Sequence, residues 1–304
     1  MSRRVKLIFN PHAQRGRAWE LGSVLQSVVE RHAGAEWAAT EYPTQATALA
    51  EQAGRDGFDI VAALGGDGTV HEVVNGLMRL PAKRRPMLAS VPIGSGNDFS
   101  ASAGVAQNAE VAMERVFSGT PKPVDLGLAI DGSGRREYFS NALGIGFDAK
   151  VTFYSYHITR LQGFSMYLWA VIQTIVRSHD APRMTLTIDD ERFEQEVLML
   201  TLCNGRREGG GFLVAPEALP DDGVLDFAMV EKVSRLMMFR LIPEVMKGTH
   251  GRFRQVRLGR FRNLELKSDR PLTIHMDGEL YSGLTSDVFE LRAEVCPEAL
   301  QVIV

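Results

Sequence analysis

The stretch DIVAALGGDGTVHEVVNGLM, at residues 59–78, decides the fold. Residues 59–64 are mostly apolar, which predicts a strand buried on both faces, and residues 69–78 are expected to form a helix. The glycines between them let the backbone turn tightly, and the N-terminus of the following helix offers free N–H groups to an anion. This order of strand, loop and helix predicts a phosphate-binding turn. The alternative is a plain strand-to-helix turn with an Asp and a Thr cap.

The rest of the first 120 or so residues repeats this alternation of strand and helix. Strands that alternate with helices imply a parallel sheet, so we expect a three-layer, Rossmann-like α/β domain. Further strands are expected at 5–10, 37–42 and 87–92, and further helices at 17–32, 45–55 and 109–117.

After Pro121-Lys122-Pro123 the pattern changes to β-type segments separated by Gly, Asp and Asn turns. We therefore predict a first domain at 1–127, with 291–304 as a candidate addition to it, and a β-rich sandwich domain at 128–290. Strong helical candidates in this second region are confined to 162–177 and 234–246. The expected strands are 183–188, 196–203, 225–230, 256–258, 264–267 and 272–276.

The composition is that of a globular chain, with 304 residues, 45% hydrophobic and 23% charged. A net charge of -3 argues against a nucleic-acid partner. Cys203 and Cys296 lack CxxC spacing, which is typical of a reducing compartment. The N-terminus reads as a strand and not as a signal peptide, and the most apolar run, 166–176, is too short to span a membrane. We expect a cytoplasmic protein whose membrane contact is peripheral.

A second glycine-rich loop, PIGSGNDF at residues 92–99, follows the fourth expected strand. Both loops should open on the carboxyl edge of one sheet, where ligands bind in open α/β folds. Asn97 and Asp98 would orient a hydrated metal or a ribose there; the alternative is an Asx turn. The chain has neither GxxxxGK[ST] nor GxGxxG, so neither a Walker loop nor a dinucleotide fingerprint is predicted.

Taken together, these loops resemble the diacylglycerol kinase catalytic domain shared by bacterial lipid kinases, ceramide kinases and sphingosine kinases. The resemblance covers nearly the whole chain, because further blocks follow in the family's order. The blocks are Asn10-Pro11, GGDGT (65–69), GSGNDF (94–99), VDLG (124–127), NALGIGFDAKV (141–151), NGRREGGGFLVAPEALPDDGVLDF (204–227) and MDGE (276–279).

The resemblance implies a nucleotide site in the first domain. The family's opening loop usually reads Asn-Pro-x-Ser-Gly, whereas this chain has NPHAQ at 10–14, which leaves open whether Arg15 or Arg17 contacts a phosphate. Ser95 replaces a frequent Thr and keeps the hydroxyl. The implied nucleotide-binding residues are Asn10, Thr40, Gly65, Gly66, Asp67, Gly68, Thr69, Val70, His71, Glu72, Ser95, Asn97 and Asp98.

The resemblance also implies catalytic carboxylates in the second domain. Glu279 is expected to accept the proton of the acceptor hydroxyl, with Asp277 positioning Glu279 or the metal; the roles could be reversed. Without the family, Asp277-Gly278-Glu279 would be interpreted as a hairpin turn.

Two magnesium sites are expected. Asp67, Asp98 and Asp125 would converge on a catalytic Mg²⁺. By resemblance, a second, structural Mg²⁺ would bind the Asp222 side chain and the carbonyls of Leu219 and Val224, and the alternative is a simple Asp-rich turn.

Two segments bear on the lipid. The helix at 162–177 is apolar beyond one stripe, so it would line an acyl-chain groove or else form a buried core helix. The run 247–262 carries six Lys and Arg residues, which would attract an anionic leaflet or else form a solvated strand face.

The sequence therefore predicts an ATP- and Mg²⁺-dependent lipid kinase that transfers the γ-phosphate to a lipid hydroxyl, with diacylglycerol as the default acceptor and phosphatidic acid as product. The lipid would be presented at the inner face of the membrane, and a homodimer is possible. The alternatives are an NAD kinase and a non-catalytic regulatory protein that binds nucleotide or lipid.

Overall fold

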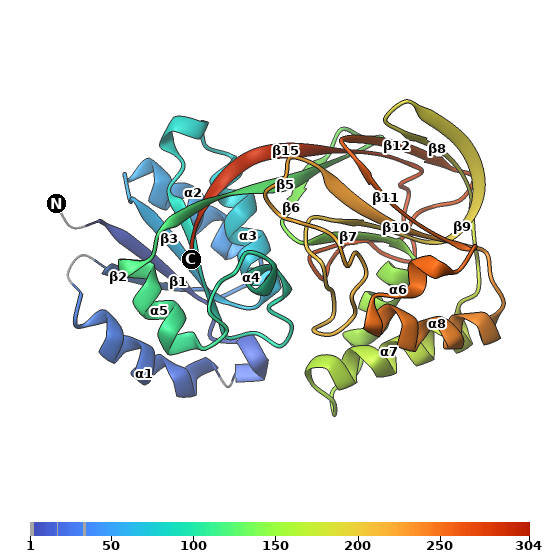
Figure 1. Cartoon of the computed structure of the whole chain (residues 1–304). Helices are drawn as coiled ribbons and strands as arrows, with labels where there is room; N and C mark the ends of the chain where they lie inside the picture. Colours follow the sequence, from blue (N-terminus) through green and yellow to red (C-terminus); the bar gives the residue numbers. More distant parts are fainter. Residues whose placement is uncertain (1–2, 17, 33–34) are drawn as a thin grey trace. The chain divides into compact units, whose positions relative to one another are not determined.

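The computed structural model describes residues 3–16, 18–32 and 35–304. The chain forms two compact units, the first from residues up to Val124 together with Glu298–Val304, and the second from Asp125–Pro297. The chain passes between them within two strands, β5 (Pro121–Asp131) and β15 (Glu290–Ile303). Each unit has its own architecture (Figure 1).

Unit 1 contains a parallel sheet, which confirms the predicted α/β class. Its strand order is β2-β1-β3-β4-β15, and β3 is buried along its whole length. The C-terminal end of β15 completes the sheet, because Val302 pairs in parallel with Leu88. The strands are β1 (Val5–Phe9), β2 (Ala35–Ala39), β3 (Ile60–Gly65) and β4 (Met87–Pro92).

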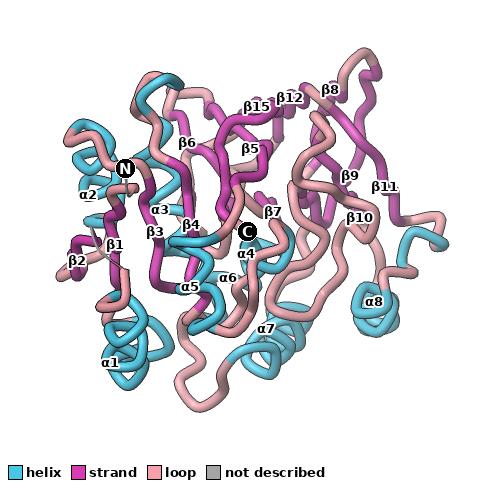
Figure 2. Tube along the Cα trace, turned by 60° about the vertical axis from the view of Figure 1, so that its left-hand side comes forward, coloured by secondary structure: helices cyan, strands magenta, loops and turns pink. Residues whose placement is uncertain are grey.

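Helices cover both faces of this sheet. Figures 1 and 2 show α1 (Ala18–Val29) and α5 (Ala109–Ser118) on one face, and α2 (Gln45–Arg55) and α3 (Asp67–Met78) on the other. The short helix α4 (Asp98–Ser102) was not predicted, because five residues are too few to show a helical period. The 3-10 turns η1 (Ala13–Gly16) and η2 (Ala82–Arg84) complete the unit.

Unit 2 is the predicted β-rich sandwich. One sheet is built from β7, β10, β11, β13, β14 and the second half of β9; the other from β5, β6, β8, β12, β15 and the first half of β9. Strand β9 thus contributes to both sheets, and side chains from both form one apolar core. The strands are β6 (Arg136–Phe139), β7 (Ala142–Gly146), β8 (Arg183–Ile188), β9 (Glu191–Cys203), β10 (Leu225–Glu231), β11 (Val256–Phe261), β12 (Asn263–Ser268), β13 (Ile274–Met276) and β14 (Glu279–Ser282).

Three helices cover the outer face of the first of these sheets. They are α6 (Phe147–Ser155), α7 (Gly163–Arg177) and α8 (Arg235–Lys247), and with β9 and β10 they enclose a second apolar core. The helix α6 corrects the prediction that helices are confined to 162–177 and 234–246; its apolar residues are not gathered on one face, so its sequence lacks the amphipathic signal. Among the described residues, no helix has both the length and the apolarity that a membrane crossing requires. The 3-10 turn η3 (His250–Arg252) follows α8.

Candidate active site

The two glycine-rich loops of unit 1 pack against each other backbone to backbone. A Cβ atom built on Gly94 would lie only 2.2 Å from the Cα of Gly66, so no side chain fits at that position. The backbone N–H of Ile93 donates to the carbonyl of Gly65 over 3.0 Å, which ties the second loop to the end of β3. The structure therefore confirms the prediction that the two loops meet at the carboxyl edge of the sheet.

Two of the predicted metal-binding carboxylates, Asp67 and Asp98, come together in these loops. A Cβ atom on Gly96 would lie 2.8 Å from Oδ2 of Asp67 and 3.2 Å from Oδ2 of Asp98, so both carboxylates face the same point. The other oxygen of Asp67 accepts from the N–H of Phe99 over 3.1 Å. Carboxylate oxygens are the ligands that Mg²⁺ prefers, so the donor set of this pair fits the ion.

Several predicted nucleotide-binding residues hold the loops in place. Asn97 has a φ of 54°, accepts from the N–H of Gly94 and donates to its carbonyl. Its amide therefore closes the loop onto a residue three positions earlier, unlike an Asx turn, in which the side chain bonds to backbone two residues further on. Asn10 donates to the hydroxyl of Thr69 over 3.1 Å and links β1 to the first turn of α3. Thr40 is buried, and its N–H donates to Phe9.

The carboxylate of Glu72 caps a neighbouring helix. Its two oxygens accept from the N–H groups of Thr44 and Ala46, at 2.9 and 3.0 Å, at the start of α2. Val70 and His71 are buried, whereas Ser95 is exposed at the tip of its loop. Arg17 and the side chain of Arg15 lie outside the described residues.

In unit 2, Asp277 is an anchor for neighbouring backbone. Its φ is 51°, and its buried carboxylate accepts from the N–H groups of Ser140, Asn141 and Ala142, at 2.7 to 3.1 Å, and from the Ser140 hydroxyl. Asp277 therefore holds the turn that carries Glu279.

Glu279 is exposed and lies at the start of β14. The hydroxyl of Tyr156, on the residue after α6, donates to its Oε2 over 3.2 Å and to the carbonyl of Gly278 over 2.8 Å. Burial, and then the charge of Glu279, raise the pKa of Tyr156 well above its usual value, so the phenol keeps its proton and serves as the donor.

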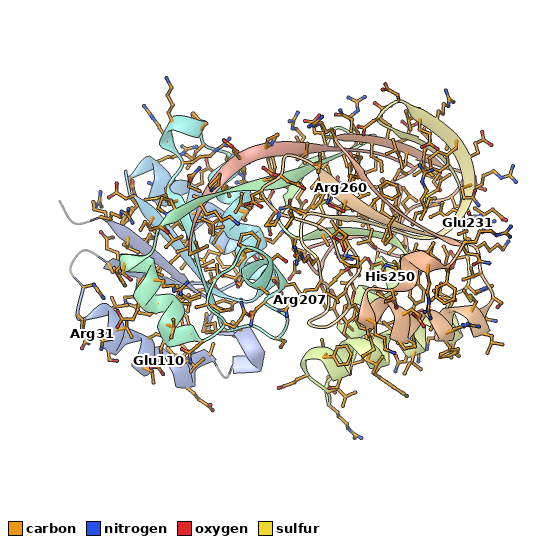
Figure 3. All side chains as sticks on the ribbon, viewed as in Figure 1. Arg31, Glu110, Arg207, Glu231, His250 and Arg260 are labelled. Atoms are coloured by element: carbon orange, nitrogen blue, oxygen red, sulfur yellow. The ribbon has the colours of Figure 1, made fainter. Side chains whose placement is uncertain are left out.

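The predicted metal residue Asp125 lies in unit 2, against the loop of the second predicted Mg²⁺ site. It is buried, it accepts from the N–H of Gly223 over 2.7 Å, and its own N–H donates to Pro220. Asp222 accepts from the N–H of Val224 over 3.3 Å, and the guanidinium of Arg260 (Figure 3) lies 3.8 Å from its other oxygen. The Mg²⁺ site at this turn stays a prediction, and an arginine lies beside the carboxylate of Asp222.

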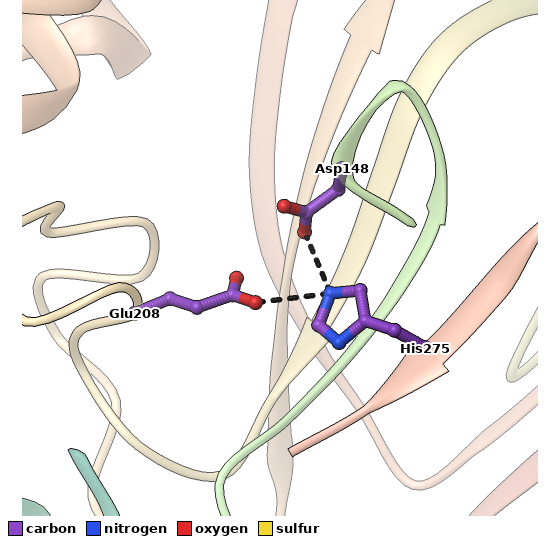
Figure 4. Close-up of side chains that lie close together, drawn as sticks. All are labelled: Asp148, Glu208 and His275. Atoms are coloured by element: carbon purple, nitrogen blue, oxygen red, sulfur yellow. Dashed lines mark ion pairs between the residues drawn. The ribbon is translucent and has the colours of Figure 1, made fainter. Parts of the chain in front are cut away.

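Sequence reasoning missed a buried cluster of Asp148, Glu208 and His275 in unit 2 (Figure 4). Asp148 is in the first turn of α6, Glu208 is in the loop after β9, and His275 is in β13. The Nε2 atom of His275 lies 2.9 Å from Oε1 of Glu208 and 3.5 Å from Oδ2 of Asp148. Two of these residues fall inside the quoted blocks 141–151 and 204–227, but nothing in those blocks indicates that they meet.

The pKa values of this cluster are shifted in opposite directions. Burial, and then the charge of Asp148, raise the pKa of Glu208 to about 7. Burial also acts to raise the pKa of Asp148, but the contact with His275 and the hydroxyl of Thr201 lower it below its usual value. Glu208 therefore carries a proton over much of the range up to neutral pH, whereas Asp148 stays ionised.

The proton of His275 belongs on Nε2. Burial lowers the pKa of the ring and the two carboxylates raise it, to about 10, but the N–H of Gly278 points at Nδ1 from 3.3 Å, which opposes a second proton there. A metal ion on Nε2 would require a proton on Nδ1, facing that same N–H group. Although the three ligand atoms lie within 4.8 Å of one another, this arrangement does not favour a metal.

The cluster adjoins an apolar pocket between the helices and the sheet of unit 2. The empty space in this pocket measures about 670 Å³, some of it open to solvent, and Asp148 and Glu208 are the acids among its described lining residues. Helix α7 supplies Tyr167, Val171 and Ile175 to the lining. The rest of the lining is Phe147, Val151, Leu198, Met199, Phe212, Val214, Val230, Met238, Leu241, Ile242 and Val245.

Fold and site define a two-unit kinase with paired glycine-rich loops in an α/β unit and a β-sandwich second unit. Residues 4–129 match the diacylglycerol kinase catalytic domain, and residues 141–304 match the YegS C-terminal NAD kinase beta sandwich-like domain. This chain belongs to the bacterial diacylglycerol kinase and YegS-like lipid kinase family, as the sequence motifs predicted.

Individual relatives agree with this placement. A Stenotrophomonas maltophilia protein named "Probable lipid kinase YegS-like" is 31% identical over 73% of this chain and 73% of its own length. The diacylglycerol kinase of Bacillus subtilis is 26% identical over 94% of this chain and 93% of its own. A diacylglycerol kinase structure from Bacillus anthracis has the same fold, with a TM-score of 0.72 at 22% identity, covering 99% of this chain and 97% of that one.

Proposed function

We propose that this lipid kinase uses ATP and Mg²⁺ to phosphorylate the free hydroxyl of diacylglycerol. The observation that carries the proposal is the connection between the apolar pocket and the Asp277–Glu279 turn. Glu208 lines the pocket, His275 touches Glu208, and the ring of His275 receives the N–H of Gly278. A lipid whose chain occupies this pocket would have its polar end beside the residues expected to activate a hydroxyl.

The nucleotide would bind to unit 1. The first turn of α3 and the exposed Ser95 offer donors to phosphate oxygens. Asp67 and Asp98 would hold the metal. Bound Mg²⁺ neutralises charge on the β- and γ-phosphates.

Glu279 is the proposed proton acceptor. As the lipid oxygen bonds to the γ-phosphorus, the bond from that phosphorus to the β-bridging oxygen breaks, ADP leaves, and the hydroxyl proton passes to Glu279. Tyr156 orients this carboxylate through its hydrogen bond. Asp277 is less suited to the role, because backbone N–H groups occupy its oxygens.

A membrane-facing surface on α7 and α8 would deliver the lipid. Trp169 and Val176 are 46% and 62% exposed and lie seven residues apart on α7, while Leu236 and Phe239 are 81% and 40% exposed on α8. Exposed apolar residues on packed helices, with an exposed Arg240 beside them, are typical of a surface that enters a headgroup layer.

In the basic run 247–262, Arg252 and Arg257 form ion pairs with Glu244 and Glu191, which supports the alternative of a solvated face there. A homodimer stays a prediction.

The test is transfer of labelled γ-phosphate from ATP with Mg²⁺ to acceptors in mixed micelles. The panel contains diacylglycerol, monoacylglycerol, phosphatidylglycerol, sphingosine and ceramide, with NAD in a parallel assay. Wild type is compared with Glu279→Gln and Asp67→Asn, and Asp190→Asn serves as the control because it changes an exposed acid of unit 2 outside the proposed site.

We expect labelled phosphatidic acid from wild type and Asp190→Asn, and its loss in the other two variants. Another labelled lipid would change the acceptor but keep the reaction. Phosphorylated NAD would replace the proposal with an NAD kinase, and ATP binding without any product would indicate a non-catalytic protein.

A further inference from the structure

We propose that Glu208, positioned by His275, recognises a neutral oxygen-bearing group of an amphipathic ligand inside the apolar pocket of unit 2. The inference rests on the proposed function in taking that ligand to be the lipid substrate. Glu208 thereby becomes a specificity determinant, separate from Glu279 at the transfer step.

The first support is an unsatisfied buried group. The Oε2 atom of Glu208 is buried and has no hydrogen-bond partner among the described residues, whereas Nε2 of His275 lies 2.9 Å from the other oxygen of the same carboxyl group. An unpaired buried polar atom is destabilising, because it has given up its hydrogen bonds to water without replacing them. Asp148 is better satisfied, because it accepts from the hydroxyls of Thr201 and Tyr167 over 2.6 and 3.3 Å. The cluster is therefore complete at Asp148 and incomplete at Glu208, which lines the pocket.

The second support is that the fold makes room for this arrangement. A Cβ atom on Gly144 would lie 2.2 Å from Nε2 of His275 and 2.4 Å from Oδ2 of Asp148, so β7 has no side chain where the ring packs. The loop that carries Glu208 is equally constrained. A Cβ atom on Gly209, whose φ is 60°, would lie 2.4 Å from the ring of Tyr167. Because this position is a glycine, the ring of Tyr167 from α7 can pack directly against the loop that carries Glu208.

The proton positions select the chemistry of the ligand. The Nε2–H group of His275 faces Oε1 of Glu208 over 2.9 Å, so with a proton on the Glu208 carboxyl the donor left for a ligand is Oε2, and a hydroxyl or ester oxygen can accept from it. The ionised Asp148 nearby repels a carboxylate. An ammonium group would instead require Glu208 to be ionised. A neutral oxygen on an alkyl chain fits both this donor and the apolar lining.

The test compares two probes of matched length, decan-1-ol and 1-chlorodecane, which differ in the terminal group. Their dissociation constants are measured by displacement of a fluorescent alkyl probe from wild type, Glu208→Leu, Glu208→Gln and Glu217→Leu. Glu217 is exposed and absent from the lining, so its variant controls for the loss of a glutamate. The ratio of the two dissociation constants is compared between wild type and each variant, because this comparison cancels the difference in hydrophobicity between the probes.

We expect Glu208→Leu to reduce the preference for decanol about tenfold, since one buried hydrogen bond is lost. Glu208→Gln keeps a donor and should stay within about threefold of wild type, and Glu217→Leu should not differ from it. An unchanged ratio in Glu208→Leu, or no binding of either probe to wild type, overturns the inference.

Kinase activity is measured on the same preparations. If Glu208→Leu shifts the ratio of dissociation constants but wild type phosphorylates no lipid, the proposed function is refuted and the subsite at Glu208 stands. If wild type phosphorylates lipid but Glu208→Leu leaves the ratio unchanged, the subsite is refuted and the proposed function stands.

Discussion

Replacing Gly94 by alanine should separate the two glycine-rich loops. The added methyl group would lie 2.2 Å from the backbone of Gly66, against 3.4–4 Å for an ordinary contact, and a backbone atom cannot move aside as a side chain can. Overpacking of this kind costs about 1–3 kcal/mol of unfolding free energy. Its larger effect should be on transfer, because a shift of roughly 1 Å in a positioned group can cost about 10²-fold in rate.

The assay measures kcat/KM for ATP with the lipid acceptor and the affinity for a non-hydrolysable ATP analogue by calorimetry. Gly22→Ala is the matched control: a Cβ there meets nothing within 4 Å, and it lies inside α1, so activity should be unchanged and the protein up to about 1 kcal/mol more stable. If Gly94→Ala keeps wild-type affinity and kcat/KM within threefold, the claim that the loops act as one packed unit is wrong.

Three further predictions concern unit 2. Glu279→Gln should lower kcat about 10²-fold or more without changing the urea midpoint, whereas Asp277→Asn should lower that midpoint, because several N–H groups lose a charged acceptor. Glu208 has a pKa of about 7 in the folded protein against 4.5 unfolded, so the free energy of unfolding should fall as pH rises from 4.5 to 7. Urea unfolding at pH 4.5 and 7.5 should show a smaller fall in Glu208→Gln than in wild type. An equal fall in both proteins would contradict the raised pKa of Glu208. Trp169→Ser should weaken sedimentation with anionic vesicles several-fold, with Trp19→Ser, which changes a 65% exposed tryptophan of unit 1, as control; equal binding by both would refute a docking surface on α7.

The class of fold could be predicted because its signals are local. The run from Ile60 to Gly65 is apolar throughout, and the helix after it begins in the loop itself, so a short window contains the whole pattern. Strand β15 is harder to recognise, because its fourteen residues include charged side chains and Pro297. Its partners, β12 and β4, are distant in the sequence, and pairing with distant strands leaves no trace in local periodicity.

One part of the candidate site could likewise be predicted from the sequence, and another part could not. The proximity of Asp67 and Asp98 follows from two loops at one sheet edge, which the sequence predicts. The cluster around His275 could not be predicted, because its members come from a helix, a loop and a strand that only the sandwich brings together. An isolated histidine in an apolar strand is indistinguishable from an ordinary core residue until its neighbours are known.

The return of β15 to unit 1 affects the order in which a growing chain can fold. Residues 298–304, which complete unit 1, are synthesised only after the whole of unit 2. Until Val302 can pair with Leu88, β4 is an open sheet edge, and such edges invite pairing with other chains. On the ribosome, unit 1 of this kinase therefore remains one strand short until unit 2 has emerged, so a truncated translation product should expose β4 and be prone to aggregate.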